Sequence, residues 1–264
     1  MIDMRFQGLY FLFFSCFMLS CGSDSPPPAS TTPTPSIAQN ALKKRVVVVI
    51  DASSSITEES KSLAAGYARQ IANTLADESH LLIYSTEKNT TQQALVDIKK
   101  ETPLKPSLRS DYESRVWPAN VKKVYDVVLA KCNQGASVSC ILDGLKSVRA
   151  GLAGATPAQE TYLLIVSDML ECCELGCPAK PKDFVGMTDK LEKSSDLAEF
   201  ELSSKIPKEH VKICYINQNA KSENATMIAS PEFRTFWRKS FALLGYNEMP
   251  EPGTSIDAFL NMIK

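Results

Sequence analysis

The stretch that most constrains the fold runs from Arg45 to Ser55 and reads Arg-Val-Val-Val-Val-Ile-Asp-Ala-Ser-Ser-Ser. Its unbroken β-branched run predicts a strand that is buried on both faces, as central strands of parallel sheets are. Ligands of such sheets bind beyond the carboxyl ends of the strands. The carboxylate of Asp51 and the hydroxyls of Ser53 and Ser55 follow the strand directly. We therefore expect their oxygens to converge at that edge of the sheet.

Strands and helices alternate along the rest of the chain. Periodicity predicts further strands over residues 80–85, 93–100, 161–168 and 211–216, and helices over residues 57–75, 121–134, 141–152, 184–200, 230–244 and 255–263. Residues 93–100 alternate in polarity, which is typical of an edge strand. Residues 103–118 contain three prolines and predict an irregular segment whose Trp117 packs over an edge of the core. The predicted fold is α/β: a doubly wound, mostly parallel sheet with one antiparallel edge strand and helices on both faces.

The N-terminus has the pattern of an export signal. Arg5 precedes an apolar run, Leu9 to Leu19, which is too short to span a bilayer comfortably. The sequence Met-Leu-Ser-Cys-Gly, which ends at Gly22, resembles the lipobox of bacterial lipoproteins, with Met at its first position where Leu is usual. The resemblance implies a signal peptide over residues 1–20 and a lipid on Cys21. An ordinary signal peptide, an N-terminal anchor helix and a buried helix of the fold are the alternatives.

Residues 21–42 are rich in Pro, Ser and Thr, and such a composition predicts a solvated tether. The folded domain would then comprise residues 43–264. With a lipid anchor, the expected location is the bacterial cell envelope, on the periplasmic side or at the cell surface of a membrane. Because one acyl chain binds a membrane only marginally, stable attachment needs the several chains that bacterial lipoproteins carry.

Charge gives no indication of a nucleic-acid partner, because 29 Lys and Arg residues are balanced by 30 Asp and Glu residues. The cysteines are more informative. If Cys16 leaves with the signal and Cys21 is acylated, an even number remains, and in an exported protein these predict disulfides that pin the loops of the binding edge. The connectivity stays open, and a zinc site on Cys172, Cys173 and Cys177 is the alternative. The disulfide candidates are Cys132, Cys140, Cys172, Cys173, Cys177 and Cys214.

Three features of the sequence resemble the von Willebrand factor A-type domain, which has a Rossmann-like fold. They are Asp51-x-Ser53-x-Ser55 after an apolar strand, a later loop with hydroxyl residues, and an aspartate that ends the next long strand. Such domains carry a metal-ion-dependent adhesion site. The resemblance implies metal ligands at Asp51, Ser53, Ser55, Ser137 and Asp168. Ser137 stands where the family has threonine, and Ser139 is an alternative to it. Met169 follows Asp168 where family members often have glycine.

The resemblance implies a non-catalytic domain that binds a partner protein through Mg²⁺ or Mn²⁺. Both ions prefer oxygen ligands, and a site poor in negative charge leaves the ion able to accept an acidic side chain from the partner. One alternative is a structural subunit of an envelope assembly with a vestigial metal site. Another is a metal-dependent phosphatase with Asp51 as nucleophile, although that chemistry usually needs an acid where this chain has Ser53.

A purely structural interpretation of the motif is also open. Ser55 and Glu58 fit a capping box at the start of the first helix, and Ser137 or Ser139 can cap the helix over residues 141–152. His80 and His210 precede predicted strands, without any catalytic motif nearby, and are expected to be solvated or structural.

Overall fold

The structure is a computed structural model. It describes residues 42–53, 56–86, 93–152, 155–173, 175–193, 211–217 (backbone only), 224–243, 245 and 255–264. Some of the predicted features lie outside these residues: the signal peptide, most of the tether, Cys21, Ser55 and His210. Leu42, expected to end the tether, is instead the first residue of a strand. The chain from Gln39 to Lys264 forms one compact unit.

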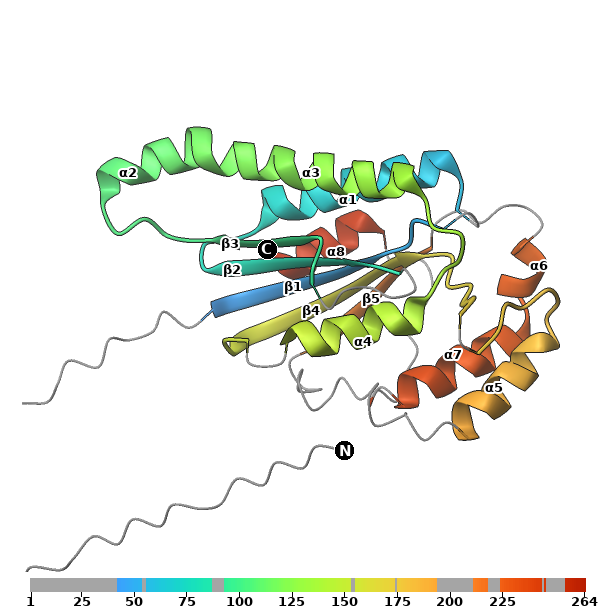
Figure 1. The fold of residues 1–264 in the computed structure, drawn as a ribbon. Coiled ribbons are helices and arrows are strands. Elements are labelled where there is room, and N and C mark those ends of the chain that lie inside the picture. Colours follow the sequence, from blue (N-terminus) through green and yellow to red (C-terminus); the bar gives the residue numbers. More distant parts are fainter. Residues whose placement is uncertain are drawn as a thin grey trace, which may run out of the picture. The chain divides into compact units, whose positions relative to one another are not determined.

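A five-stranded sheet with the strand order β3-β2-β1-β4-β5 forms the centre of this unit (Figure 1). Four strands are parallel, and β3 at the edge runs antiparallel to β2. The doubly wound sheet with its antiparallel edge strand is therefore confirmed. The strands are β1 (Leu42–Ile50), β2 (Ser79–Ser85), β3 (Val96–Lys100), β4 (Ala158–Ser167) and β5 (Val211–Asn217).

Helices cover both faces of the sheet, because alternate residues of the buried strands point to opposite sides. Val46 and Val48 belong to one apolar core, with α1 (Glu58–Thr74), α3 (Trp117–Gln134) and α8 (Ile256–Ile263). Val47 and Val49 belong to the other, with α4 (Ile141–Leu152), α5 (Asp183–Lys193), α7 (Pro231–Leu243) and the short α6 (Ala225–Ile228) (Figure 1). Among the described residues, no helix is both long and apolar enough to cross a membrane.

The segment predicted to be irregular is helical from Pro106 onward, and that prediction was wrong. It contains α2 (Pro106–Asp111) and a π-helical turn, η1 (Tyr112–Val116), which leads directly into α3. Pro118 lacks an N–H and its ring crowds the preceding turn, so the helix widens there instead of ending. Trp117 packs on the core as expected, with 6% of its surface exposed.

Serine side chains cap the starts of α7 and α8. The amide of Phe233 donates to Ser230 Oγ (3.2 Å), and the amide of Ala258 donates to Ser255 Oγ (3.1 Å). The capping box on Ser55 was wrong, because Thr57 caps α1 by accepting from the Ser60 amide (3.2 Å).

Candidate functional site

The register of the sheet sets three polar residues side by side at its carboxyl edge. Ile50 pairs with Ser85 on one side and with Val166 on the other, so the next residues of the three strands are neighbours. These residues are Asp51, Thr86 and Ser167, and all three are buried. Backbone hydrogen bonds continue the sheet past the strand ends, because Asp51 N donates to Val166 O (2.9 Å) and Thr86 N donates to Ile50 O (3.2 Å).

The carboxylate of Asp51 is the centre of this cluster. Its Oδ1 accepts from the Ser53 amide (2.9 Å) and from Thr86 Oγ1 (3.2 Å). Its Oδ2 accepts from Ser139 Oγ (2.9 Å) and from Ser167 Oγ (2.7 Å). A hydroxyl that donates its proton to a carboxylate keeps its lone pairs for another partner. Asp51 therefore fixes the direction of three hydroxyl oxygens from three different segments.

The loop between α3 and α4 carries the two candidate serines. Gly135 ends α3 with a φ of 66°, a conformation that suits glycine. The loop then runs beside the strand end, since Ala136 N donates to Ala52 O (3.0 Å) and Cys140 N donates to Thr86 O (2.7 Å). Ser137 is exposed, next to the residue that pairs with Ser53, while Ser139 is buried and contacts Asp51.

The loop after β4 is held from two sides. Asp168 is fully buried, and its Oδ1 accepts from the Leu170 amide (3.0 Å). Met169 has a φ of 62°, a left-handed conformation that costs a non-glycine residue about 1 kcal/mol. Ser167 Oγ accepts from the Met169 amide (2.8 Å), and Trp237 Nε1 of α7 donates to the Met169 carbonyl (2.8 Å). These contacts and the burial of the Met169 side chain offset the backbone strain.

Disulfides tie the same loops together, which confirms the expectation of disulfides. Cys140, at the start of α4, is bonded to Cys173 in the loop after Asp168, and Cys172 is bonded to Cys177.

The zinc alternative was wrong, because all three of its sulfurs are in disulfides. Cys132 was a wrong candidate: it is a free, buried thiol, and burial raises its pKa to about 11. The side chain of Cys214 lies outside the described residues.

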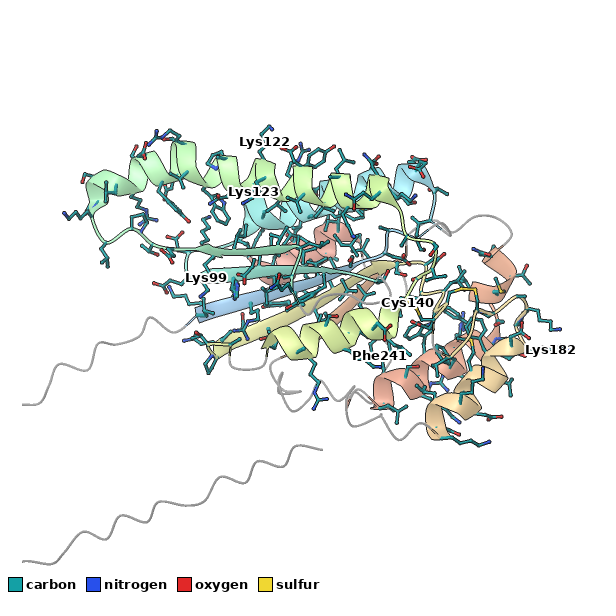
Figure 2. All side chains as sticks on the ribbon, in the orientation of Figure 1. Lys99, Lys122, Lys123, Cys140, Lys182 and Phe241 are labelled. Atoms are coloured by element: carbon teal, nitrogen blue, oxygen red, sulfur yellow. A yellow bond between two sulfur atoms is a disulfide. The ribbon has the colours of Figure 1, made fainter. Side chains whose placement is uncertain are left out.

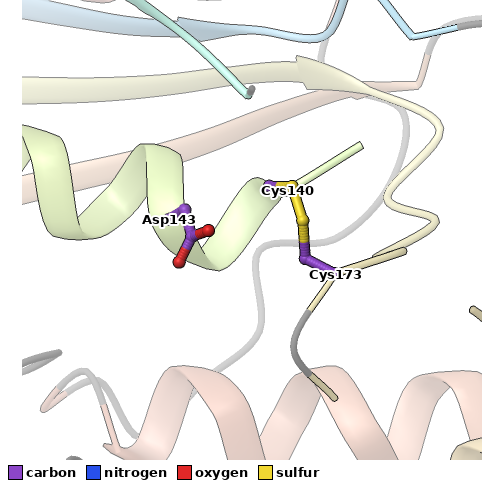
Figure 3. Close-up of side chains that lie close together, drawn as sticks. All are labelled: Cys140, Asp143 and Cys173. Atoms are coloured by element: carbon purple, nitrogen blue, oxygen red, sulfur yellow. A yellow bond between two sulfur atoms is a disulfide. The ribbon is translucent and has the colours of Figure 1, made fainter. Parts of the chain in front are cut away.

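A second group with metal-ligand chemistry lies at the Cys140–Cys173 bond. The ligand atoms of Cys140, Asp143 and Cys173 are within 4.8 Å of one another. Figure 3 shows the three side chains. The two sulfurs are bonded to each other, so they offer no thiolates to a metal ion. We therefore place the candidate metal site at the Asp51 cluster.

Glu171 was missed by the sequence analysis. Its side chain is buried, and its Oε2 accepts from the Leu142 amide (3.0 Å), so that it caps α4 from a distant part of the chain. Serine capping of α4 by a neighbour in sequence was expected instead. Burial raises the pKa of Glu171 to about 8, with the Leu142 amide acting in the opposite direction. A single sequence holds no local signal for a cap 29 residues away.

We expect Glu171→Gln to remove part of the pH dependence of stability. The folded-state pKa of about 8 lies above the ordinary value of 4.5, so the folded protein holds a proton that the unfolded chain releases. The stability contributed by protonated Glu171 is complete below the unfolded pKa and is lost as the pH rises toward the folded pKa. Urea unfolding at several pH values between these limits should show the wild-type protein losing stability relative to the variant. A constant difference between the two proteins would contradict the raised pKa.

The structure places Asp51, Ser53 and Asp168 in buried positions at the ends of adjacent strands, with Ser137 in the facing loop. Ser55 lies outside the described residues. Thr86 and Ser167 were not predicted to belong to the site. Thr86 directly follows one predicted strand and Ser167 lies near the end of another, which was the available signal.

No protein-family model matches the sequence, and no curated protein matches it. Among solved structures, a von Willebrand factor type A from Catenulispora acidiphila is 14% identical with a TM-score of 0.46, covering 84% of this chain and 41% of that chain. A minor pilin from Streptococcus sanguinis is 12% identical with a TM-score of 0.45, covering 85% of this chain and 60% of the pilin chain. A pilus adhesin from Lactobacillus rhamnosus GG is 11% identical with a TM-score of 0.46, covering 85% of this chain and 29% of the adhesin chain.

This chain thus spans less than two thirds of each of these three proteins. The expected likeness to a von Willebrand factor A-type domain is confirmed for the fold, which rests here on the strand order and register.

Proposed function

We propose that this protein is a non-catalytic adhesion or assembly module that binds a partner protein through a divalent cation at the Asp51 cluster. The observation that carries this proposal is the convergence of hydroxyl oxygens from three segments on one buried carboxylate. The residues fit Mg²⁺ or Mn²⁺, because the candidate donors are all oxygen atoms. Asp51, Ser53, Ser55, Ser137 and Asp168 would hold the ion, with Ser139 as the alternative to Ser137. The bound ion would offer an open coordination position to an acidic side chain of the partner.

We also propose that the module is exported and attached to a membrane of a bacterial envelope. The support is in the sequence: the apolar run before Cys21 and the Pro, Ser and Thr residues that follow it. A lipid on Cys21 and a tether that ends before Leu42 would attach the folded domain to the membrane. Mass spectrometry of the protein purified from membranes would detect a lipidated Cys21 at the mature N-terminus, and an unmodified cysteine would contradict this part.

Titration calorimetry with Mg²⁺ and with Mn²⁺ tests the cation site. We expect saturable binding to the wild-type protein and a loss of affinity of roughly tenfold or more in Asp168→Asn. Asparagine keeps an acceptor for the Leu170 amide but removes the charge. Asp126→Asn is the matched control, because Asp126 is an exposed residue of α3 that pairs with Lys122. Absence of cation binding to the wild-type protein would refute the metal site.

One observation favours a second candidate, a structural module of an envelope assembly with a vestigial metal site. Both oxygens of Asp51 already accept two hydrogen bonds each, so the cluster is satisfied by the protein itself. Under this alternative, assembly of the protein with its envelope partners survives chelation by EDTA. Co-purification with and without EDTA distinguishes the two candidates, because the cation-bridged complex should dissociate.

A further inference from the structure

The segment from Leu104 to Val116 extends past the end of the sheet (Figure 1). It consists of the end of the loop after β3, the short helix α2 and the π-helical turn η1, and none of its residues is buried. Three of its apolar side chains face solvent, since Leu104 is 94%, Leu108 56% and Val116 38% exposed. Helices in folded proteins are stabilised mainly by packing of an apolar face. The described part of the domain leaves this apolar surface uncovered.

A groove of about 340 Å³ connects these side chains. Its apolar lining comes from Pro103, Leu104, Leu108, Tyr112 and Val116, which we call the apolar tip. Single exposed apolar residues are ordinary on a protein surface, whereas a contiguous group of them marks an interaction site. The apolar tip is such a group.

Charge does not select a strongly charged partner for the apolar tip. Residues 101–116 carry three basic and three acidic side chains. Two of the acids are paired with arginines of the same segment, Glu113 with Arg109 (2.8 Å) and Asp111 with Arg115 (2.9 Å). The contact that this surface can make is therefore mainly apolar.

The apolar tip lies at the end of the sheet where β1 begins. Lys43 N donates to Glu78 O (3.0 Å) and Glu78 N donates to Lys100 O (2.6 Å), so the starts of β1 and β2 adjoin the end of β3. The loop to the apolar tip leaves β3 after Lys100. Lys99, in the same strand end, lies away from Cys140 (Figure 2). The proposed tether, which ends before Leu42, thus joins the domain at the same end as the apolar tip.

We propose that the apolar tip inserts into the lipid bilayer to which the module is attached. This inference rests on the proposed membrane attachment, which makes insertion an intramolecular step, so that a small apolar surface suffices. The acyl region would cover Leu104, Leu108 and Val116, and the paired charges would stay among the headgroups. The Asp51 cluster follows the other end of β1, a strand of nine residues and about 30 Å in length, and would face away from the bilayer.

The native tryptophans make insertion measurable. Trp117 and Trp237, the two in the sequence, are only 6% and 0% exposed, so a tryptophan introduced at the surface can be distinguished from them. The full chain, purified with its lipid, is reconstituted in phosphatidylcholine vesicles with and without brominated acyl chains. Bromine quenches the emission of a tryptophan that reaches the acyl region.

We expect Leu104→Trp to show a blue-shifted emission and a loss of intensity of roughly twofold or more in the brominated vesicles. Val185→Trp is the matched control, because Val185 is a 53% exposed apolar residue of α5, at the other end of the domain from α2 (Figure 1). Its emission should be the same in both kinds of vesicle. Equal quenching of the two variants would overturn the proposal.

Vesicle flotation of the same samples separates this inference from the membrane attachment. If the protein floats with the vesicles and Leu104→Trp is not quenched, insertion of the apolar tip is refuted and the attachment stands. If the protein does not float, the attachment is refuted and this inference fails with it.

A second substitution tests whether the side chains of the apolar tip act together. In the Leu104→Trp background, Leu108→Ser should lower the quenching severalfold, because it removes apolar surface beside the inserted residue. Leu63→Ser, the same change at an exposed residue of α1, should leave it unchanged. Equal quenching in these two double variants would show that the new tryptophan inserts by itself, and would overturn the proposal. Quenching that requires added phosphatidylglycerol would show electrostatic adsorption instead of apolar insertion, and would overturn it as well.

Discussion

Replacement of Asp51 by alanine is expected to lower the free energy of unfolding by roughly 3 to 5 kcal/mol and to remove cation binding. The carboxylate is fully buried and accepts four hydrogen bonds. Alanine leaves an amide and three hydroxyls without their acceptor, at the point where loops from β1, β2 and β4 meet. Urea unfolding measures the loss of stability, and titration calorimetry measures the loss of Mg²⁺ binding.

The variant Asp51→Asn separates the two effects. The amide oxygen of asparagine still accepts from two donors, and the hydroxyls of Ser139 and Ser167 can rotate to accept from its NH₂ group. We expect Asp51→Asn to retain much of the stability that Asp51→Ala loses and still to bind no cation. Added Mg²⁺ should therefore stabilise the wild-type protein against urea and leave Asp51→Asn unaffected. If Asp51→Ala is as stable as the wild-type protein, the hydrogen-bond cluster is not the centre of the edge.

The central strand and Asp51 could be predicted from the sequence, whereas two of the contacts of Asp51 could not. A continuous β-branched run predicts a buried strand, and the motif after it predicts the edge of the sheet where the candidate metal site lies. Thr86 and Ser167 contact Asp51 because of the alignment of three strands that are distant in sequence. Where strands are buried on both faces, their uniform apolar pattern does not specify the register, so their end residues cannot be matched from sequence alone.

The remaining misses arose where the structure departs from a local rule. Pro118 predicts a break in a helix, but the π-helical turn before it lets the helix continue, and Trp117 anchors it on the core. A local serine was expected to cap α4, but Glu171 does so from across the site. An even number of cysteines suggested complete pairing, but Cys132 is a free thiol where α3 packs on the core.

The second large effect concerns the Cys140–Cys173 disulfide. We expect the double variant Cys140→Ser, Cys173→Ser to lose about 3 to 4 kcal/mol of stability, because the bond closes a loop with a sequence separation of 33. The pair Cys172→Ser, Cys177→Ser is the matched control. Its separation is 5, and the same loop-entropy relation gives about 2 kcal/mol. Both cysteines of a bond must be changed together, since a single remaining thiol can attack the adjacent disulfide.

The same double variant tests whether the disulfide supports the cation site. The bond joins the start of α4, which follows Ser137 and Ser139, to the loop that follows Asp168. Without it, these two segments are held at this end by hydrogen bonds such as that from Cys172 N to Ser139 O (2.7 Å). Mg²⁺ affinity should therefore fall in Cys140→Ser, Cys173→Ser by more than in the control pair. Equal affinities in the two double variants would show that the disulfide stabilises the fold without positioning the candidate ligands, and that the hydrogen bonds to Asp51 suffice to hold the edge.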